Sequence, residues 1–470
     1  MDMNKLREAA SRIWNAETLP ALKTFVSRES LSTDFDPEWE KHGILNEVCR
    51  EAAAWGTRML PRGTYDVQQE PGRTPALIFS VPGTGLYAGR EEDTVFFYGH
   101  LDKQPPATGW SEGLGPFTPV VRDGKLYGRG CSDDGYSVYA ALTAIRALED
   151  AGIPHPRAVG LIETREESGS NDLEHYLKKN AARFGSPRLV CVLDSGAGNY
   201  EQLWLTSSLR GACAIDLNVR VLRQGMHSGT ASGVVPSSFD VLRILLDRIQ
   251  DPAFNVEIPS NRMDDMKKTA EVLGDGFISE FPWAEGPNGS VQSRCRGTEE
   301  ALIARCWKPT LSVTGAAGLP PLSMAGNSLR SDTTLRLSFR LPPTAKTENI
   351  LPALQKKLLT DPPFNAVVSI AGGDALPGWN APSEADWFRS ACDESSKALW
   401  GKPAMRIGEG GSIPILNLFE AQFPRAQFAV TGVLGPGSNA HNADESLDLA
   451  YTEKFIAAVG YLAASIPEEA

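Results

Sequence analysis

The sequence predicts an α/β protein with a mostly parallel sheet, into which a smaller α+β domain is inserted. In the first part of the chain, short runs of consecutive apolar residues alternate with amphipathic helical segments, as expected for strands buried on both faces. From about residue 208 the strands instead alternate apolar and polar residues, which is typical of a sheet with one face in water. The first pattern returns after Pro382, so the smaller domain interrupts the larger one.

Each element follows from the period of its apolar residues. In the larger domain we predict, in order, helical structure over 4–27, a strand at 95–98, a helix from Tyr136 to Gly152, a strand at 158–162, a helix at 173–184, a strand at 189–193 and, after Pro382, a helix, a glycine-rich loop, a strand at 427–433 and a last helix. In the inserted domain we predict a strand at 213–221, a helix at 239–249, a strand at 335–341, a helix at 350–358 and a strand at 366–370.

These elements place the domain boundaries. We assign residues 1–207 and 376–470 to the larger domain and 208–375 to the inserted one. The stretch 252–330 is rich in Gly, Pro and Ser, and we read it as mostly irregular.

Composition restricts the function class. With 46 basic and 58 acidic side chains among 470 residues, the net charge is −12, which argues against a nucleic-acid or anionic-membrane surface. We find neither the apolar core of a signal peptide nor an apolar run long enough to span a bilayer. The seven cysteines are scattered without a Cys-x-x-Cys pair, which favours free thiols and a cytoplasmic location.

Histidines and acidic residues follow the ends of the predicted buried strands. They are His100 and Asp102, the pair Asp133 and Asp134 in a loop before a helix, Glu166 and Glu167, Asp194, and His441. In an open α/β sheet, ligands bind outside the carboxyl ends of the strands, so these side chains should converge on one crevice. Taken singly, each acid could equally be a helix cap or a solvated loop residue.

So many carboxylates in one crevice would repel each other strongly unless some are protonated or a cation intervenes. Two divalent ions would solve this, because imidazole and carboxylate ligands suit Zn²⁺, with Mn²⁺ as an alternative. Two such ions roughly 3.5–4 Å apart can share a carboxylate, activate a water and polarise a carbonyl.

Two other motifs are rejected. Residues 83–88 match the dinucleotide fingerprint G-x-G-x-x-A, but a turn and another strand follow where a helix should begin. The chain therefore lacks the phosphate-binding loop that an NAD-linked oxidoreductase needs. Residues 109–113 match the serine-hydrolase pattern G-x-S-x-G without the flanking strand and helix that it requires.

An ordered series of motifs then carries a family resemblance. The series is GHLDKQP, GRGCSDDG, EESGS, LDSG, GMHSGT, SFRLPP, EGGSIP and SNAHNADES. From about residue 95 to the end, the chain resembles the dinuclear-zinc metallopeptidases that include carnosinases, other cytosolic dipeptidases, carboxypeptidase G, aminoacylase and succinyl-diaminopimelate desuccinylase. The carnosinase-like dipeptidase branch is the most similar. The resemblance implies a catalytic domain of the zinc-exopeptidase type with an inserted lid and dimerisation domain.

The resemblance also implies a role for each site residue. His100 and Asp194 would hold one ion, and Glu167 and His441 would hold the other. Asp133 would bridge the two ions from a loop in which the Asp133–Asp134 peptide bond is cis. Asp102 would orient His100, and Glu166 would be the general base.

In the inserted domain, the resemblance implies that His227 reaches the active site of the second subunit of a homodimer and stabilises the oxyanion. Arg340 would bind the terminal carboxylate of the substrate, and Asn327 and Ser412 would be further substrate contacts. The less favoured alternatives, from local sequence alone, are a loop histidine for His227 and the polar face of a strand for Arg340. The chain departs from the family pattern at Gly135, at Arg165 and in the residues SLRS after Asn327.

We therefore expect a metal-dependent hydrolase of dipeptides or short peptides with a free carboxylate. The alternatives are an N-acyl-amino-acid deacylase, which also cleaves an amide beside a carboxylate, and a metal-binding interaction protein that has lost catalysis. A family member that has lost catalysis would be expected to lack some metal ligands or the general base. All five proposed ligands and the proposed base are present in this sequence.

Overall fold

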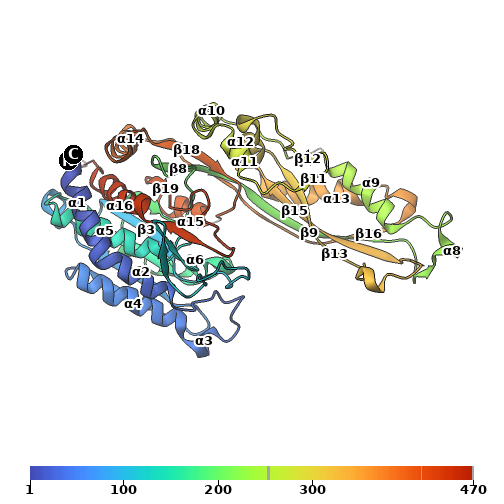
Figure 1. Ribbon diagram of the computed structural model, residues 1–470, viewed down its shortest axis with the longest axis horizontal. Helices are drawn as coiled ribbons and strands as arrows, with labels where there is room; N and C mark the ends of the chain where they lie inside the picture. The colour runs from blue at the N-terminus through green and yellow to red at the C-terminus, as the bar shows by residue number, and fades with distance from the viewer. Residues whose placement is uncertain (251–253, 414, 468–470) are drawn as a thin grey trace. The chain divides into compact units, whose positions relative to one another are not determined.

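A computed structural model describes residues 1–250, 254–413 and 415–467 (Figure 1). Of the predicted spans, residues 251–253, 414 and 468–470 lie outside this range. The chain forms two compact units, one of residues 1–206, 381–407 and 418–470, and one of residues 207–380 and 408–417. Residues 408–417 thus belong to the second unit, whereas the sequence-based division placed them in the larger domain.

The first unit is built on a six-stranded sheet. Its strands, in spatial order, are β1 (Thr64–Gln68), β2 (Ala76–Val81), β6 (Arg157–Glu163), β3 (Thr94–His100), β7 (Pro187–Val192) and β19 (Gln427–Val430). Strands β6, β3, β7 and β19 pair in parallel, and the hairpin β1–β2 adds two antiparallel strands at one edge. Every residue of β3 is buried. The fold class predicted from the continuous apolar runs is confirmed.

Helices cover both faces of this sheet. On one face lie α1 (Met3–Ile13), α4 (Ile44–Met59), α5 (Tyr136–Asp150) and α16 (Leu449–Ala464). On the other face, the Phe96 ring lies 5.0–5.3 Å from the rings of Phe184, Phe419 and Phe423. The remaining helices of the unit are α2 (Leu19–Val26), α3 (Trp39–His42), α6 (Leu173–Lys179), α7 (Ala181–Phe184), α14 (Asp386–Trp400) and the end of α15 (Ile415–Gln422). A π-helical turn, Trp14–Thr18, divides the helical stretch predicted over 4–27.

Gly99 has a specific packing role beside the predicted site. A Cβ on Gly99 would lie 2.0 Å from Ser137 Oγ and 2.7 Å from Asp134 Oδ2. Only glycine therefore lets β3 lie this close to the start of α5. This close approach brings the end of β3, with His100, next to the loop that carries the paired aspartates.

The second unit contains a four-stranded antiparallel sheet. Its strands, in spatial order, are β13 (Thr310–Ala317), β15 (Asp332–Leu341), β9 (Gly211–Arg220) and β16 (Val367–Leu376). The alternate apolar residues of β9 and β15 pack against α9 (Ser238–Gln250) and α13 (Ile350–Leu359) in one core. Figure 1 shows both helices lying along this sheet. The chain passes between the units along β8 (Trp204–Leu209) and β18 (Met405–Glu409), which form a small sheet with β17 (Trp379–Asn380).

The expectation that 252–330 is mostly irregular is wrong for its described part. This stretch contains α10 (Ser260–Leu273), α11 (Gly276–Ser279), the short strands β11 (Glu285–Gly286) and β12 (Gly289–Ser290), α12 (Thr298–Trp307), strand β13 and the short strand β14 (Ser328–Leu329). Strand β13 is an edge strand with most of its residues exposed, so its sequence lacks the alternation of apolar and polar residues seen in β9. For this reason the strand could not be predicted from its apolar periodicity. By contrast, the turn expected at 83–88 is present as a single 3₁₀ turn, Gly85–Tyr87.

Candidate metal centre

His100 is the last residue of β3, and Asp102 follows it in the loop; both are fully buried. Asp102 Oδ1 lies 3.3 Å from His100 Nδ1. The same carboxylate accepts hydrogen bonds from the backbone N–H groups of Glu166 (3.1 Å) and Glu167 (3.0 Å). Asp102 therefore orients the imidazole and, at the same time, fixes the start of the turn that carries both glutamates.

The paired aspartates lie in the loop before α5. The peptide bond between Asp133 and Asp134 is cis, as the family resemblance implied. Asp134 Oδ2 accepts a hydrogen bond from the backbone N–H of His100 at 3.1 Å. Asp133 points its carboxylate between two histidines, with Oδ1 lying 3.5 Å from His100 Nε2 and Oδ2 lying 2.9 Å from His441 Nε2.

Two groups of potential metal ligands share Asp133. The first consists of His100, Asp133 and Asp194, and the second of Asp133, Glu167 and His441; within each group the ligand atoms lie within 4.8 Å of one another. The structure thus brings together all five residues that the sequence analysis named as ligands. They come from strand ends and loops that are separated by up to about 340 positions in the sequence. α/β sheets bind ligands outside the carboxyl ends of their strands, which is where these residues lie.

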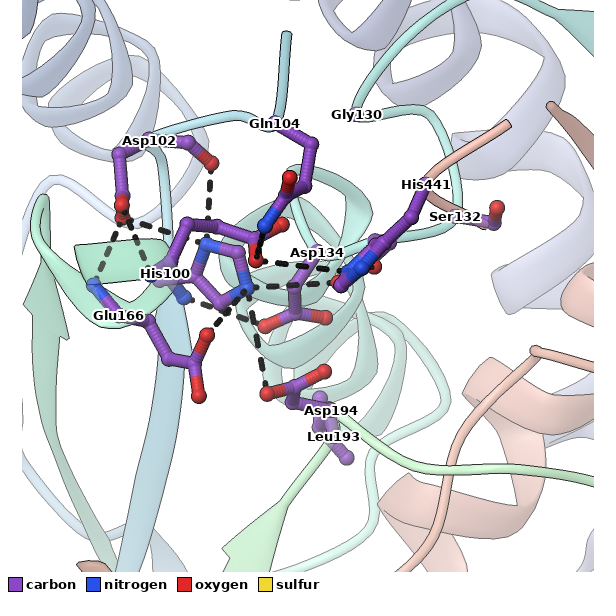
Figure 2. A network of polar contacts seen from close by, with 12 residues as sticks. His100, Asp102, Gln104, Gly130, Ser132, Asp134, Glu166, Leu193, Asp194 and His441 are labelled. Carbon is purple, nitrogen blue, oxygen red and sulfur yellow. Dashed lines mark hydrogen bonds and ion pairs between the residues drawn. The ribbon is translucent and has the colours of Figure 1, made fainter. Parts of the chain in front are cut away.

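The nitrogen of His100 that faces this cluster has no hydrogen-bond partner. His100 Nε2 is buried and lies 3.9 Å from Asp194 Oδ2 and 4.0 Å from Glu166 Oε2, in addition to its contact with Asp133. Figure 2 shows the side chains of Glu166 and Asp194 directed toward the imidazole. A buried nitrogen aimed at carboxylates, with the other ring nitrogen held by Asp102, is the arrangement that metal-binding histidines adopt. The residues present therefore fit a divalent cation.

The carboxyl groups here are electrostatically crowded. Burial, together with the charge of Asp133 and despite the attraction of His100, raises the pKa of Asp194 to about 7. Burial and the charge of Asp194 raise the pKa of Glu166 well above its ordinary value, and burial and the charge of Asp133 raise that of Glu167. Burial and the repulsion between neighbouring carboxylates thus both disfavour the charged form of these groups, and a bound cation would favour it.

The pKa values of both histidines are raised as well, because the nearby carboxylates favour the protonated, charged imidazole. Interaction with Asp133, then with Glu167, raises the pKa of His441 to about 10. Burial acts to lower the pKa of His100, but Asp102 and Asp133 outweigh it and raise that pKa well above its ordinary value. Burial acts to raise the pKa of Asp133, and the attraction of His100 and His441 outweighs it and lowers that pKa. A divalent cation would replace the protons that these imidazoles hold.

Glu166 lies beside the ligand cluster without belonging to either ligand group. It begins a single 3₁₀ turn, Glu166–Ser168, directly after Arg165. Its Oε2 lies 4.0 Å from His100 Nε2. The carboxylate thus lies beside the first set of ligands without being a member of it.

Two of the predicted substrate contacts of the second unit lie together. Arg340, on β15, donates from Nη1 to Ser412 Oγ at 3.1 Å, and Ser412 Oγ donates to the backbone carbonyl of Arg210 at 2.6 Å. No ion pair joins Arg210 or Arg340 to a carboxylate within the described residues, and burial followed by repulsion from Arg340 and Arg305 lowers the pKa of Arg210 to about 10. This cluster therefore offers unneutralised positive charge to an anion. Arg210 was not identified from the sequence.

The other two predicted residues of this unit also lie near each other. His227 ends the short strand β10 (Met226–His227), just before α8 (Ser228–Ala231), and the backbone carbonyl of Asn327 accepts a hydrogen bond from Ser228 N at 2.9 Å. Strand β10 pairs with β14, which places Ser328 directly opposite His227. Both His227 and Asn327 are exposed.

Two departures from the family pattern have structural explanations. A Cβ on Gly135 would lie 1.9 Å from Phe25 Cε1, so the Phe25 ring occupies the space where a side chain at 135 would start. The buried Lys103 lies over the same ring at 4.2 Å and donates to the carbonyls of Phe25 and Val26. Arg165 forms an ion pair with Asp172 (3.6 Å).

The sequence analysis also missed Gln104, Arg129 and Glu445 near the centre. Gln104 Nε2 donates to Glu167 Oε2 at 2.7 Å. Arg129 and Glu445 form a buried ion pair of 2.8 Å beside the loop of the paired aspartates. Glu445 lies within the quoted motif SNAHNADES, but nothing in the local sequence distinguishes it from a solvated acid.

Comparison with known proteins agrees with this geometry. Residues 96–466 match the family model described as peptidase family M20/M25/M40. The chain is 26% identical over 467 residues to the Cys-Gly metallodipeptidase dug1 of Schizosaccharomyces pombe, covering 96% of this chain and 95% of that protein. It is 26% identical over 411 residues to the cysteinylglycine-S-conjugate dipeptidase of Corynebacterium striatum, covering 86% and 87%.

A solved structure shares the fold over nearly the whole chain. The crystal structure of human carnosine dipeptidase 1 superimposes with a TM-score of 0.74 at 21% identity, and the match covers 99% of each chain. The paired ligand groups around Asp133 lie within the region matched by the family model. This chain is a metallopeptidase that belongs to peptidase family M20/M25/M40.

Proposed function

We propose that this protein is a dipeptidase that uses two divalent ions to hydrolyse the amide bond of dipeptides or short peptides with a free carboxylate. The observation that carries the proposal is the pair of ligand groups that share Asp133, with Glu166 beside them. Relatives across nearly the full length are named as dipeptidases, which supports the same substrate class here.

The five ligands divide between the ions as the two groups suggest. His100 and Asp194 would hold one ion, Glu167 and His441 the other, and Asp133 would contact both. Zn²⁺ is the ion that we propose, with Mn²⁺ as the alternative, because the ligands are two imidazoles and three carboxylates. When bound, the ions supply Lewis-acid polarisation of the scissile carbonyl and lower the pKa of a water.

The chain itself supplies proton transfer and positioning. Glu166 takes a proton from the attacking water and returns it to the leaving nitrogen, a role that suits a carboxyl group whose pKa burial has raised. Asp102 keeps His100 in the orientation and tautomer needed for binding through Nε2. Arg340, supported by Ser412, would bind the substrate carboxylate through the planar guanidinium, which matches carboxylate geometry. Asn327 would be a further contact to the substrate.

A substrate panel combined with metal analysis tests this proposal. Purified protein should contain two divalent ions per chain and hydrolyse dipeptides, and turnover should disappear after stringent chelation and return on adding Zn²⁺ or Mn²⁺. Amidating the C-terminal carboxylate should lower kcat/KM by about 10²-fold, because a charge-assisted pair with Arg340 is lost. Faster hydrolysis of N-acetyl amino acids would identify a deacylase instead. Bound metal with no turnover on any amide would favour an interaction protein, and full activity without metal would contradict the proposal.

We further propose a homodimer in which His227 of one subunit serves the active site of the other. A donor aimed at the developing oxyanion accounts for about 10²–10³ in rate. The His227→Ala and Glu166→Ala variants should therefore be nearly inactive alone, yet regain activity when mixed as heterodimers, because each heterodimer keeps one site with both residues intact. The measurement is turnover of heterodimers isolated by two different affinity tags. Isolated heterodimers with no recovered turnover would contradict the shared site.

The cytoplasm is the location that we propose. All seven cysteines are unpaired, which is the usual state in a reducing compartment. Within the described residues, no helix has the length and apolar character needed to cross a membrane.

A further inference from the structure

Glu445 is a buried carboxylate that holds the backbone of the loop leading to Asp133. Its Oε1 accepts hydrogen bonds from the N–H groups of Gly130 (3.0 Å), Ser132 (3.2 Å) and Asp133 (3.3 Å), and from the Ser132 hydroxyl (3.2 Å). The side chain has no exposed surface. A carboxylate that binds several successive N–H groups imposes one conformation on that backbone, because each bond constrains a neighbouring peptide.

Arg129 extends this set of contacts to the loop that carries His441. Its Nη1 donates to Glu445 Oε2 at 2.8 Å, its Nη2 to the carbonyl of Asn442 at 3.0 Å, and its Nε to the carbonyl of Pro105 at 3.0 Å. Only 1% of Arg129 is exposed. Its guanidinium nitrogens thus bond two segments, the loop that contains Asn442 and Glu445 and the loop that contains Pro105, and Asn442 is the neighbour of a proposed ligand.

The His441 loop needs such support because its backbone is unfavourable. Asn439, His441 and Asp444 all have positive φ values, of 54°, 64° and 60°. Asn, Asp and His tolerate this left-handed conformation better than most non-glycine residues do, but it is still uncommon and is held in place by surrounding contacts. His441 itself is 53% exposed, so packing around its side chain does not provide that constraint. The contacts of Arg129 and Glu445 at the base of the loop contribute that constraint, together with the hydrogen bond from Ser111 N to Asp444 Oδ1 (2.9 Å).

An alternative explanation of these contacts is that the buried ion pair only stabilises the fold. Buried ion pairs add little net stability, because burying each charge costs about as much as their attraction returns. What distinguishes this pair is where its remaining bonds go. They connect the backbone of Asp133 to the backbone beside His441, and these are the two residues whose side chains approach to 2.9 Å.

We propose that the Glu445–Arg129 pair is a positioning clamp that fixes Asp133 and His441 at the separation needed to hold a divalent ion with Glu167. The inference rests on the proposed function, since it assigns the pair a task at that metal centre. The clamp contacts the second ligand group at two points, Asp133 and the neighbour of His441. It contacts the first group, which contains His100 and Asp194, only through Asp133. Its loss should therefore weaken binding at the second group more than at the first.

The test measures each ligand group separately by calorimetric titration of the metal-free protein with Mn²⁺. His441→Ala leaves the group of His100, Asp133 and Asp194, and His100→Ala leaves the group of Asp133, Glu167 and His441. Adding Glu445→Gln should weaken Mn²⁺ binding about 10–100-fold in the His100→Ala background, the usual effect of losing a residue that supports metal ligands. In the His441→Ala background the loss should be several-fold smaller.

The matched control is Glu384→Gln. Glu384 also pairs with a buried arginine, Arg406, at 3.0 and 3.1 Å, and Arg406 donates further hydrogen bonds to Asp393 and Ala404, none of which is a proposed ligand. This control should lower the Tm without changing Mn²⁺ affinity in either background. If Glu445→Gln fails to fold, Arg129→Lys takes its place, because one ammonium group cannot reproduce the three directed bonds of the guanidinium.

The outcomes separate the clamp from the proposed function. Equal losses in the two backgrounds, or no loss at the group with His441, would overturn the clamp. If the wild-type protein binds no divalent ion at all, the proposed function fails, and the clamp with it.

Discussion

The Glu166→Gln variant should lose about 10²–10⁴-fold in kcat while keeping both metal ions, because general acid–base catalysis contributes a factor of this size. Glutamine has nearly the shape of glutamate but cannot accept the proton of the attacking water. Glu166 belongs to neither ligand group, so its replacement removes no ligand. The measurements are steady-state kinetics on the best dipeptide of the panel and the metal content of the same sample.

Two comparisons make this result specific. Glu166→Asp keeps the carboxyl group but withdraws it by one methylene, so its activity should lie between those of wild type and Glu166→Gln. KM should change little in Glu166→Gln, since the lost interaction is made in the transition state. Wild-type turnover by Glu166→Gln would assign the proton transfer to another group, and loss of an ion would make Glu166 a ligand.

The Asp133→Asn variant should lose both ions and, with them, nearly all activity. Asp133 is shared by the two ligand groups, with Oδ1 toward His100 and Oδ2 toward His441. An amide offers one neutral oxygen in place of two charged ones, so neither ion keeps its full set of ligands. Metal-assisted catalysis supplies several kcal/mol, and each 1.4 kcal/mol is tenfold, so hydrolysis should fall by about 10³-fold or more.

His441→Ala is the matched comparison, because it removes a ligand of the second group alone. Metal analysis after extensive dialysis should find one ion retained in His441→Ala and none in Asp133→Asn. Two tightly held ions in Asp133→Asn would show that this carboxylate does not bridge them.

The sequence alone was sufficient for the features that depend on local pattern. Continuous apolar runs such as 95–98 predict buried parallel strands, because only a strand covered on both faces can be apolar throughout. Residues that directly follow such strands then share one edge of the sheet by topology. For this reason His100, Asp194 and Glu167 could be placed in one crevice, and the structure does bring them together.

Only the tertiary structure revealed the contacts that join distant segments. Arg129 and Glu445 are 316 positions apart, and each resembles an ordinary surface charge until the fold buries both beside the aspartate loop. Arg210 likewise becomes part of a cationic cluster only when Arg340 and Ser412 are brought to it from other segments. Apolar periodicity records which face of an element avoids water. It contains no information on which polar groups meet after burial, because that depends on the path of the whole chain.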